Sequence, residues 1–576
     1  MFKELLKSSR LAARKRASIF IADAGLVSDE DLWRGEFQID GGKKITIWVF
    51  LPEFFPDELP VIMVNRLQLP RQIPHIEKSG KICLAPSTGI LLDKENPEGI
   101  VRDSLKIAQN TITEGLAGQR DDDFCKEFLA YWDPTDTYIA DCNVNGKTRK
   151  IKLLLMEYTG HNWNLLEKWV LTDTLERGQK LIDMMGGTLK KRRTAFFVSL
   201  DKSIPTPYFD ILTVQETMRI VQDACHLDSW TSLQEWLLQS TVPATVLLSI
   251  PNCEGRILAA IQFESPTVHG FRPDKVLTKI VLQSAQHNPI KRIGLERFDA
   301  SFLIPRGGAM DDLQDKTIAV IGCGSVGSHI IERIASLGVG HFRLVDSELL
   351  ESLNLYRHAL GISYVGRSKS ESMCDCICSR YPHIEAQARA RDIRIVLNDE
   401  PKFIMDADLV LLALGDETLE LRIDELLGMK KPRIHAWVEP LGIGGHVLAT
   451  GLGNSHGCFR CLFQRAEDGS MANRAAFAKP GQLFQKSMAG CSGIFTPYAG
   501  IDADRTAIEV ARLVIKILTG KETRNQLVSW YGDPEEFEQA GFHLSKRAQN
   551  LFSPGDCKSQ IDITDSECPH CGGGTK

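Results

Sequence analysis

The sequence lacks any long hydrophobic run and any strong excess of one charge. No apolar segment approaches the roughly 18 residues that a membrane-spanning helix requires. The 68 basic and 74 acidic residues leave a net charge of −6, which gives no general reason to expect binding to nucleic acid or to a membrane surface. We therefore expect neither kind of partner.

The N-terminal segment also lacks the features of a signal peptide. MFKELLKSSRLAARKRASIFIADAG is basic, but it has no uninterrupted apolar core and no small-residue cleavage site, so it predicts an amphipathic helix followed by a strand. The 15 cysteines are an odd number scattered over a long chain, which is typical of reduced thiols in a cytosolic protein. We expect a cytoplasmic protein whose cysteines are ligands, nucleophiles or core residues.

Internal repeats and long low-complexity segments are absent, and 576 residues are too many for one core. Residues 1–145 begin with a helix and continue with strand-like runs and a second helix, an α+β pattern. Residues 146–300 mix strands and helices, with a hairpin predicted at residues 252–255, and carry no chemical constellation. Residues 301–576 alternate strands and helices, which predicts a doubly wound, mostly parallel α/β sheet.

A glycine-rich turn in the third part predicts a nucleotide site. The strand TIAVIG leads into GCGSVG, in which Gly322 permits a tight turn, Gly324 lets phosphate approach the backbone and Gly327 allows close helix packing. The following helix offers its N-terminus to phosphate. Asp346 ends the next strand, where a carboxylate can accept hydrogen bonds from ribose hydroxyls. Taken alone, this pattern has NAD as its default ligand.

The residues that follow favour a nucleoside triphosphate instead. Arg357, three residues after Asn354, and Lys369 supply cations that neutralise phosphate, and Asp416 follows a strand at a place where it can hold Mg²⁺. Each residue alone could be solvated surface, but a hydride-transfer site has no need of their joint order and spacing.

This string of motifs resembles the ThiF-type adenylation domain of ubiquitin-activating enzymes and of their bacterial relatives in sulfur transfer. The matching segments are GCGSVG, VDSE, NLYR, VGRSK and GDET. The resemblance implies a domain that uses ATP and Mg²⁺ to adenylate the C-terminal carboxylate of a protein and releases pyrophosphate. The residues that it assigns to the nucleotide and metal are Asp346, Asn354, Arg357, Lys369 and Asp416.

Two Cys-x-x-C pairs indicate a structural zinc site. Cys458 and Cys461 form the first pair, Cys568 and Cys571 the second, and together they offer four thiolates to Zn²⁺. The 106 residues between the pairs exceed ordinary zinc-ribbon spacing, but the resemblance implies one such site. A redox role is less favoured because neither pair opens a helix in a thioredoxin-like unit.

Cys491, in SMAGCSGIFTP, is the candidate nucleophile of this part. It lies between glycines and follows a polar segment that reads as an exposed crossover loop, where a thiol is accessible. Its place, 30 residues after Cys461, matches the catalytic cysteine of the family. We expect Cys491 to accept the acyl group from the adenylate as a thioester.

Cys83, in PHIEKSGKICLAP, is either a small core residue or a second reactive thiol. The Pro-rich strand connection, this loop and the helix after it resemble the ubiquitin-conjugating fold, in which a cysteine before leucine carries a thioester. The family's His-Pro-Asn segment is replaced by Pro74-His75, so its asparagine, which supports the oxyanion, is missing. His75 is the candidate substitute.

A conjugating-like domain ahead of an activating domain resembles the bacterial fusions found beside cGAS-like nucleotidyltransferases in CBASS antiphage operons. The resemblance implies that the C-terminal tail of the nucleotidyltransferase is the acyl donor, that a lysine or another amine is the acceptor, and that the enzyme is a homodimer. The alternatives are a sulfur-carrier activating enzyme of cofactor biosynthesis, which has no need of Cys83, and a non-catalytic scaffold.

Overall fold

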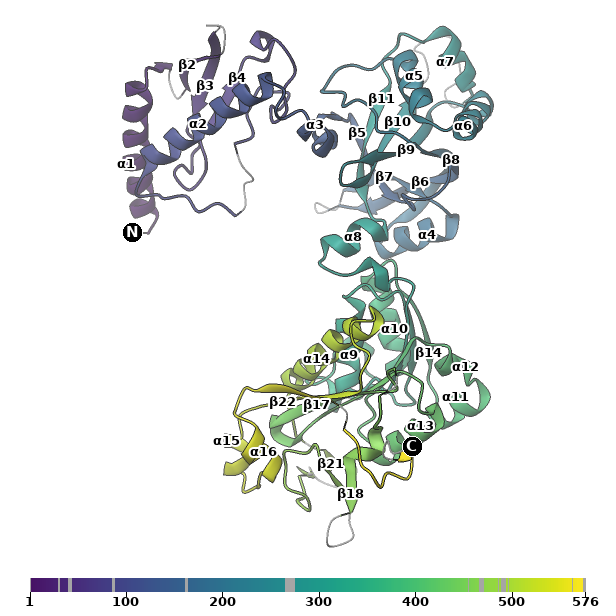
Figure 1. The fold of residues 1–576 in the computed structure, drawn as a ribbon. Helices are drawn as coiled ribbons and strands as arrows, with labels where there is room; N and C mark the ends of the chain where they lie inside the picture. The colour runs from purple at the N-terminus through teal and green to yellow at the C-terminus, as the bar shows by residue number, and fades with distance from the viewer. Residues whose placement is uncertain are drawn as a thin grey trace. The chain divides into compact units, whose positions relative to one another are not determined.

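The computed structural model divides into two compact units, residues 1–299 and residues 300–576 (Figure 1). The structure describes residues 2–29, 32–39, 44–84, 89–160, 164–264, 275–453, 455–465, 471–484, 486–487, 494–495, 497–561 and 563–572. None of the helices within these ranges has the length and hydropathy needed to cross a membrane.

The N-terminal part of the first unit is a four-stranded antiparallel sheet with two helices. Its elements are α1 (Phe2–Asp23), β1 (Val27–Asp29), β2 (Leu32–Gln38), β3 (Lys44–Phe50), β4 (Val61–Val64) and α2 (Pro97–Leu116). Alternate residues of β3, Ile45, Ile47 and Val49, are buried and share one core with Val101 and Ile112 of α2. The α+β arrangement predicted from the strand runs and the long helix is confirmed.

The rest of the first unit is built on a closed barrel with the strand order β10-β11-β5-β7-β6-β8-β9. The strands are β5 (Asp136–Asp141), β6 (Arg149–Thr159), β7 (Leu165–Thr172), β8 (Thr188–Ser199), β9 (Ala244–Asn252), β10 (Gly255–Phe263) and β11 (Lys291–Arg297), and the helices are α4 (Leu175–Met184), α5 (Val214–Ala224), α6 (Leu227–Gln239) and α7 (Thr278–Ser284). Successive residues of β8 face opposite sides: Phe197 packs with Leu153, whereas Phe196 stacks on Trp236 of α6. The hairpin predicted at residues 252–255 is present between β9 and β10.

The segment after Asp121 differs from the sequence prediction. The acidic run from Asp121 to Asp123, followed by FCKEFLAYWDP, predicts one helix that ends near Trp132, but the structure has only α3 (Asp123–Lys126) and a 3-10 turn, η2 (Phe128–Tyr131). Phe128 and Trp132 are both buried in the core formed with α5 and α6. Burial of these two side chains in that core favours the observed short turns over a continuous helix.

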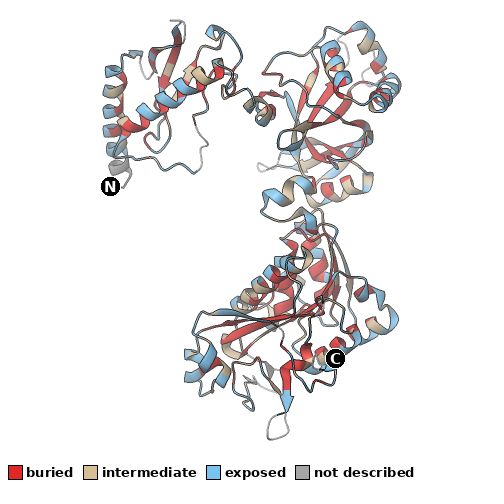
Figure 2. Ribbon diagram, in the orientation of Figure 1, coloured by how far each residue is buried: buried red, intermediate tan, exposed pale blue. Residues whose placement is uncertain are grey.

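The second unit is a doubly wound sheet of eight strands with the order β14-β13-β12-β15-β16-β17-β22-β23. The strands are β12 (Thr317–Ile321), β13 (His341–Val345), β14 (Glu385–Arg389), β15 (Leu409–Leu412), β16 (Arg433–Val438), β17 (Gly444–Thr450), β22 (Gln526–Tyr531) and β23 (Cys557–Ile561). The first five are parallel and the last three pair antiparallel. Figure 2 shows the buried residues concentrated in this sheet and on the inner sides of its helices.

Helices cover both faces of the sheet. They are α8 (Ala300–Arg306), α9 (Ser325–Ala335), α10 (Lys369–Arg380), α11 (Ile393–Asp399), α12 (Lys402–Met405), α13 (Glu417–Leu427), α14 (Gly500–Leu518), α15 (Glu535–Gln539) and α16 (Lys546–Leu551). On β12, Ile318 and Val320 join the core shared with α9, α10 and α14, while Ala319 and Ile321 join the core shared with α11, α12 and α13. This alternation of buried residues on both faces confirms the predicted doubly wound fold.

The polar segment ahead of Cys491 is only partly the exposed loop that the sequence predicts. Phe477 is fully buried; its ring packs against Tyr531, and its backbone N–H donates to Glu439 Oε1 at 2.8 Å. One aromatic residue therefore anchors the middle of this segment to the sheet.

Candidate functional site

The glycine-rich turn lies where the sheet reverses its winding order. β12 pairs with β13 on one side and with β15 on the other, so the carboxyl ends of β12 and β15 border the crevice in which such sheets bind ligands. Gly322 leaves β12 with φ of +91°, and a Cβ atom there would lie 2.6 Å from the carbonyl oxygen of Ala413. Only glycine fits this turn.

The other two glycines of the turn have different surroundings. A Cβ atom on Gly327 would lie 1.9 Å from the Gly322 carbonyl oxygen, so Gly327 is required for α9 to pack on the turn. A Cβ atom on Gly324 would meet nothing within 4 Å. Gly324 is the N-cap of α9, and it has no side chain that could cap the first N–H groups of the helix. The open space in front of unpaired helix N–H groups fits a phosphate.

Asp346 closes one side of the turn. Its Oδ2 accepts from the Cys323 backbone N–H at 2.7 Å, and its Oδ1 accepts from the Glu348 N–H at 2.8 Å. Burial raises the pKa of Asp346, whereas these two N–H groups and the nearby Lys369 ammonium lower it. The carboxylate is thus fixed against the turn.

Lys369 is a buried cation beside Asp346. It is the first residue of α10, and its Nζ donates to Glu348 Oε2 at 2.5 Å. The Lys369 side chain is 6% exposed, whereas its partner Glu348 is 71% exposed. A carboxylate that lies mostly in solvent is readily displaced, so Lys369 can exchange it for a phosphate oxygen.

Asn354 and Arg357 lie on the segment that passes in front of α9. The Ser325 hydroxyl of α9 donates to the Arg357 carbonyl oxygen, and the Arg357 guanidinium lies over the Tyr498 ring at 5.6 Å. Asn354 Oδ1 accepts from the Glu351 N–H at 3.0 Å. The structure therefore brings Arg357 to the glycine turn through its backbone, while the Asn354 side chain caps its own turn.

His358 is a part of this site that sequence reasoning missed. Its Nδ1 accepts from the Leu360 N–H at 3.0 Å, so Nε2 carries the ring proton and donates to the Cys323 carbonyl oxygen at 2.8 Å. Burial lowers the pKa of His358 to about 4. The sequence feature that could have indicated His358 is its place directly after Arg357. Its contact with the glycine-rich turn becomes visible only in the folded chain.

Asp416 follows β15, at the same edge of the sheet as the turn. It is exposed, and its Oδ1 accepts from the Leu419 N–H at 3.0 Å as the N-cap of α13. A carboxylate in this position at the edge of the crevice fits Mg²⁺ held together with triphosphate oxygens. Because Asp416 also caps α13, part of its role is structural.

The two Cys-x-x-C pairs come together in the second unit. The Sγ–Sγ distances are 3.8 Å for Cys458–Cys461, 3.7 Å for Cys458–Cys568 and 3.4 Å for Cys461–Cys571. A tetrahedron of thiolates with Zn–S bonds of about 2.3 Å has sulfurs about 3.8 Å apart. Three of the four cysteines are buried and all four face one point, so the donor set fits zinc.

Cys83 lies at the end of a segment that runs beside β4. Ile82 donates its N–H to Ile62 at 2.8 Å, and the Cys83 N–H donates to the His75 carbonyl oxygen at 2.8 Å. The Cys83 side chain is exposed. Partial burial raises the pKa of the Cys83 thiol, and the nearby carboxylates Glu127 and Glu77 raise it further. The structure thus places Cys83 at the surface, while His75 lies directly behind its backbone.

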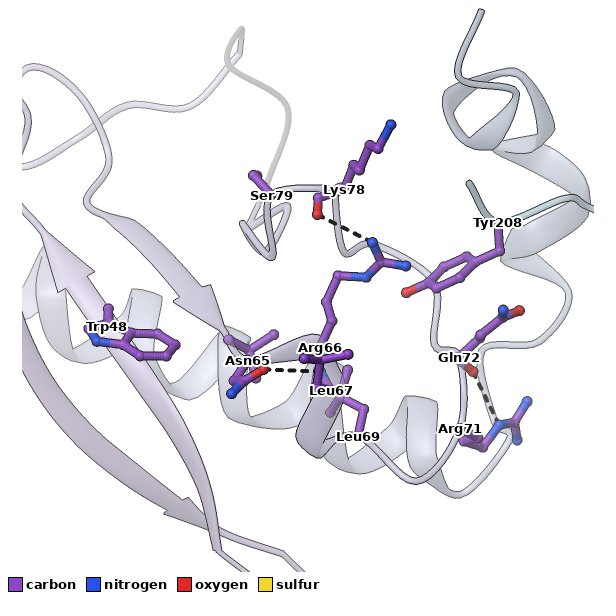
Figure 3. Close-up of a pocket in the computed structure, with 11 residues that line it drawn as sticks. Trp48, Asn65, Arg66, Leu67, Leu69, Arg71, Gln72, Lys78, Ser79 and Tyr208 are labelled. Atoms are coloured by element: carbon purple, nitrogen blue, oxygen red, sulfur yellow. Dashed lines mark hydrogen bonds between the residues drawn. The ribbon is translucent and has the colours of Figure 1, made fainter. Parts of the chain in front are cut away.

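A groove of about 780 Å³ runs beside the same segment (Figure 3). Lys78 and Ser79 border it ahead of Cys83, and Trp48 of β3 and Tyr208 line its walls. The Arg66 guanidinium points across it and donates to the Lys78 carbonyl oxygen at 3.2 Å. The groove therefore lies beside the loop that leads to Cys83 and is lined by aromatic and basic groups. Cys491, the other predicted nucleophile, lies outside the described residues.

Two family matches cover the two parts of the chain that carry these sites. Residues 18–139 match the Prokaryotic E2 family B and residues 295–548 match the ThiF family. The first match covers the domain that carries Cys83 and the second covers the glycine turn and its sheet. The chain is a fusion of a ubiquitin-conjugating-like domain with a ThiF-type domain.

Similar proteins extend this assignment to nearly the whole chain. The ATP-dependent ubiquitin transferase-like protein Cap2 of Pseudomonas aeruginosa is 22% identical over 90% of this chain and 90% of its own length. The adenylyltransferase and sulfurtransferase UBA4 of Yarrowia lipolytica is 26% identical over 39% of this chain and 52% of its own. A crystal structure of E. coli MccB with ATP is 18% identical over 46% of this chain and 68% of its own, with a TM-score of 0.32. The chain is a homologue of the Cap2 proteins.

Proposed function

We propose that this protein adenylates the C-terminus of a partner protein with ATP, carries it as a thioester first on Cys491 and then on Cys83, and joins it to an amine. The observation that carries the proposal is the presence, on one chain, of a nucleotide crevice with Asp346 and Lys369 and of an exposed thiol, Cys83, in a conjugating-like domain. A sulfur-carrier activating enzyme has no use for the second thiol.

In this reaction the partner's carboxylate oxygen attacks the α-phosphorus of ATP and pyrophosphate leaves. The N–H groups at the start of α9 and the ammonium of Lys369 face the negative charge that builds up, and Arg357 adds a third positive contact. Asp416 would hold Mg²⁺, which neutralises the phosphate oxygens when bound. The thiolate of Cys491 then takes the acyl group and AMP leaves.

The partner that we propose is the C-terminal tail of a cGAS-like nucleotidyltransferase, by resemblance to the CBASS fusions, and the product would prime antiphage signalling. The same resemblance supports a homodimer and a zinc ion on Cys458, Cys461, Cys568 and Cys571. The acceptor is a lysine or another amine.

The test is ATP–pyrophosphate exchange with such a nucleotidyltransferase as donor. We expect exchange that depends on the donor, disappears when its last residues are deleted, and is lost in Lys369→Ala. Exchange that is independent of the donor's C-terminus would overturn the proposal.

A further inference from the structure

His75 holds an unusual backbone conformation directly behind Cys83. Its φ is +63°, a region that side chains other than glycine rarely adopt. Its carbonyl oxygen accepts the Cys83 N–H at 2.8 Å, and its own N–H donates to the Tyr131 hydroxyl at 2.8 Å. A strained residue that fixes the backbone of a candidate nucleophile indicates a constraint imposed by its surroundings.

Two carboxylates grip the His75 ring from opposite sides. Nε2 lies 3.0 Å from Asp123 Oδ2 and Nδ1 lies 2.8 Å from Glu127 Oε1. Both carboxylates come from one turn of chain, and the ring is only 19% exposed. Because neither ring nitrogen is left over, the ring orients the backbone of His75 and has no N–H free for an oxyanion. We call Asp123 and Glu127 the carboxylate clamp.

The barrel part of the same unit supports the clamp. Glu127 Oε2 accepts from the Tyr131 hydroxyl at 2.6 Å, and the Tyr131 carbonyl oxygen accepts from the Phe209 N–H at 3.2 Å. The Tyr208 hydroxyl donates to the Ile73 carbonyl oxygen at 2.7 Å, two residues before His75. Phe209 and Tyr208 also hold positive φ. These contacts connect residues of the barrel part to the backbone that carries His75.

We propose that Asp123 and Glu127 are positioning residues that clamp His75 so that its carbonyl oxygen holds Cys83 in place for acyl transfer to an amine. The inference rests on the proposed role of Cys83 as a thioester carrier. In that step the amine nitrogen attacks the thioester carbonyl carbon, the C–S bond breaks, and Cys83 leaves as a thiolate. The proton lost by the amine goes to solvent, and the thiolate regains one from solvent. The clamp also gives residues 146–299 a function, because their loop at 208–209 braces it.

The charges near Cys83 permit a test that separates positioning from charge alone. Glu127 and Glu77 both raise the pKa of Cys83, and Lys81 lowers it. Glu77 faces Cys83 from its own loop, where it pairs with Lys81 at 3.4 Å. Glu77→Gln is therefore the matched control for Glu127→Gln: each variant removes one nearby negative charge, but only Glu127 touches His75.

The experiment loads Cys83 without ATP. A short peptide with a C-terminal mercaptoethanesulfonate thioester is incubated with the full-length protein, where the Cys83 thiolate displaces mercaptoethanesulfonate. Peptide mapping by mass spectrometry identifies the acylated cysteine, with Cys83→Ala as the blank. Free lysine is then added, and the rate at which the Cys83 thioester disappears is measured.

We expect lysine discharge to fall between about tenfold and a hundredfold in Glu127→Gln and in Asp123→Asn, because the thioester is no longer held in position. Discharge in Glu77→Gln should stay near the wild-type rate. Alkylation of Cys83 by iodoacetamide at pH 8 should become faster in both Glu127→Gln and Glu77→Gln, since both changes lower the pKa of the thiol.

Discharge at the wild-type rate in both clamp variants, or equal slowing in Glu77→Gln, would overturn the proposal. A melting temperature equal to that of the wild type shows which clamp variant is folded, and the two variants provide independent tests. A wild-type protein that cannot be loaded at Cys83, or that does not discharge to lysine, would contradict the proposed function itself.

Discussion

The buried side chain of His358 makes the shape of the glycine-rich turn depend on the protonation of its own ring. The neutral ring accepts from one backbone N–H and donates to the Cys323 carbonyl oxygen. A second ring proton would remove the acceptor and place a charge in a buried site. The shape of the turn therefore depends on His358 staying neutral.

This residue predicts a loss of stability in mild acid. The pKa of His358 falls from 6.5 to about 4 on folding, so the unfolded chain binds more protons between these pH values. The contribution is complete above pH 6.5 and is lost as the pH falls towards 4, by about 3 kcal/mol. We expect the melting temperature of His358→Gln to vary less between pH 6.5 and 4 than that of the wild type. Parallel profiles would contradict this.

Asp416 has two roles that one pair of substitutions separates. Asparagine caps a helix as well as aspartate does, whereas alanine costs about 1 kcal/mol. We expect Asp416→Asn to keep the wild-type melting temperature but to lose Mg²⁺-dependent ATP–pyrophosphate exchange. Asp416→Ala should lose both stability and exchange. Wild-type exchange in Asp416→Asn would remove the metal role and leave only the cap.

The junction of β12 and α9 predicts different effects on stability when two of its glycines are replaced by alanine. The Cβ of Gly327→Ala would lie 1.9 Å from a backbone oxygen, whereas that of Gly324→Ala would meet nothing within 4 Å. We expect Gly327→Ala to lower the melting temperature. Gly324→Ala should fold normally but lose the rise in melting temperature that ATP and Mg²⁺ cause in the wild type.

Thermal shift measurements with and without ATP check both variants. An ATP-dependent shift that persists in Gly324→Ala would mean that the phosphates do not approach this backbone. A stable Gly327→Ala would contradict the close packing of α9 on the turn.

Elements with a strong local pattern were predictable, and their partners in space were not. β3, with alternating Ile45, Ile47 and Val49, and the glycine turn after β12 follow from spacing alone. The barrel does not, because β5 pairs with β7 and β11, which lie far apart in the chain, and periodicity carries no information on such pairing. For the same reason the site at Cys83 was predicted without Asp123 and Glu127, since they meet His75 only in the folded chain.

At the scale of the whole molecule, the four cysteines join distant parts of the second unit. Cys458 and Cys461 follow β17, while Cys568 and Cys571 lie near the end of the described chain. Thiolate ligation contributes directly to folding free energy. We expect about one tightly bound zinc per chain, lost in Cys458→Ser, together with faster proteolysis of residues 563–572.

Metal analysis of protein purified without chelators checks this prediction. Cys557→Ser is the matched control, because Cys557 is an exposed cysteine of the same unit outside the cluster. Wild-type protein without zinc, or equal loss of zinc in the control, would contradict the assignment.

The proposed function requires that one chain activates an acyl group in its second unit and transfers it from a thiol in its first. The most direct measurement is a reaction of the full-length protein with ATP and the cGAS-like donor, followed on gels with and without reductant for wild type, Cys83→Ala and Cys491→Ala. We expect a reductant-sensitive adduct but no stable amide product in Cys83→Ala, and neither product in Cys491→Ala. Amide product at the wild-type yield from Cys83→Ala would contradict the carrier role of Cys83 and leave the first domain as a docking module.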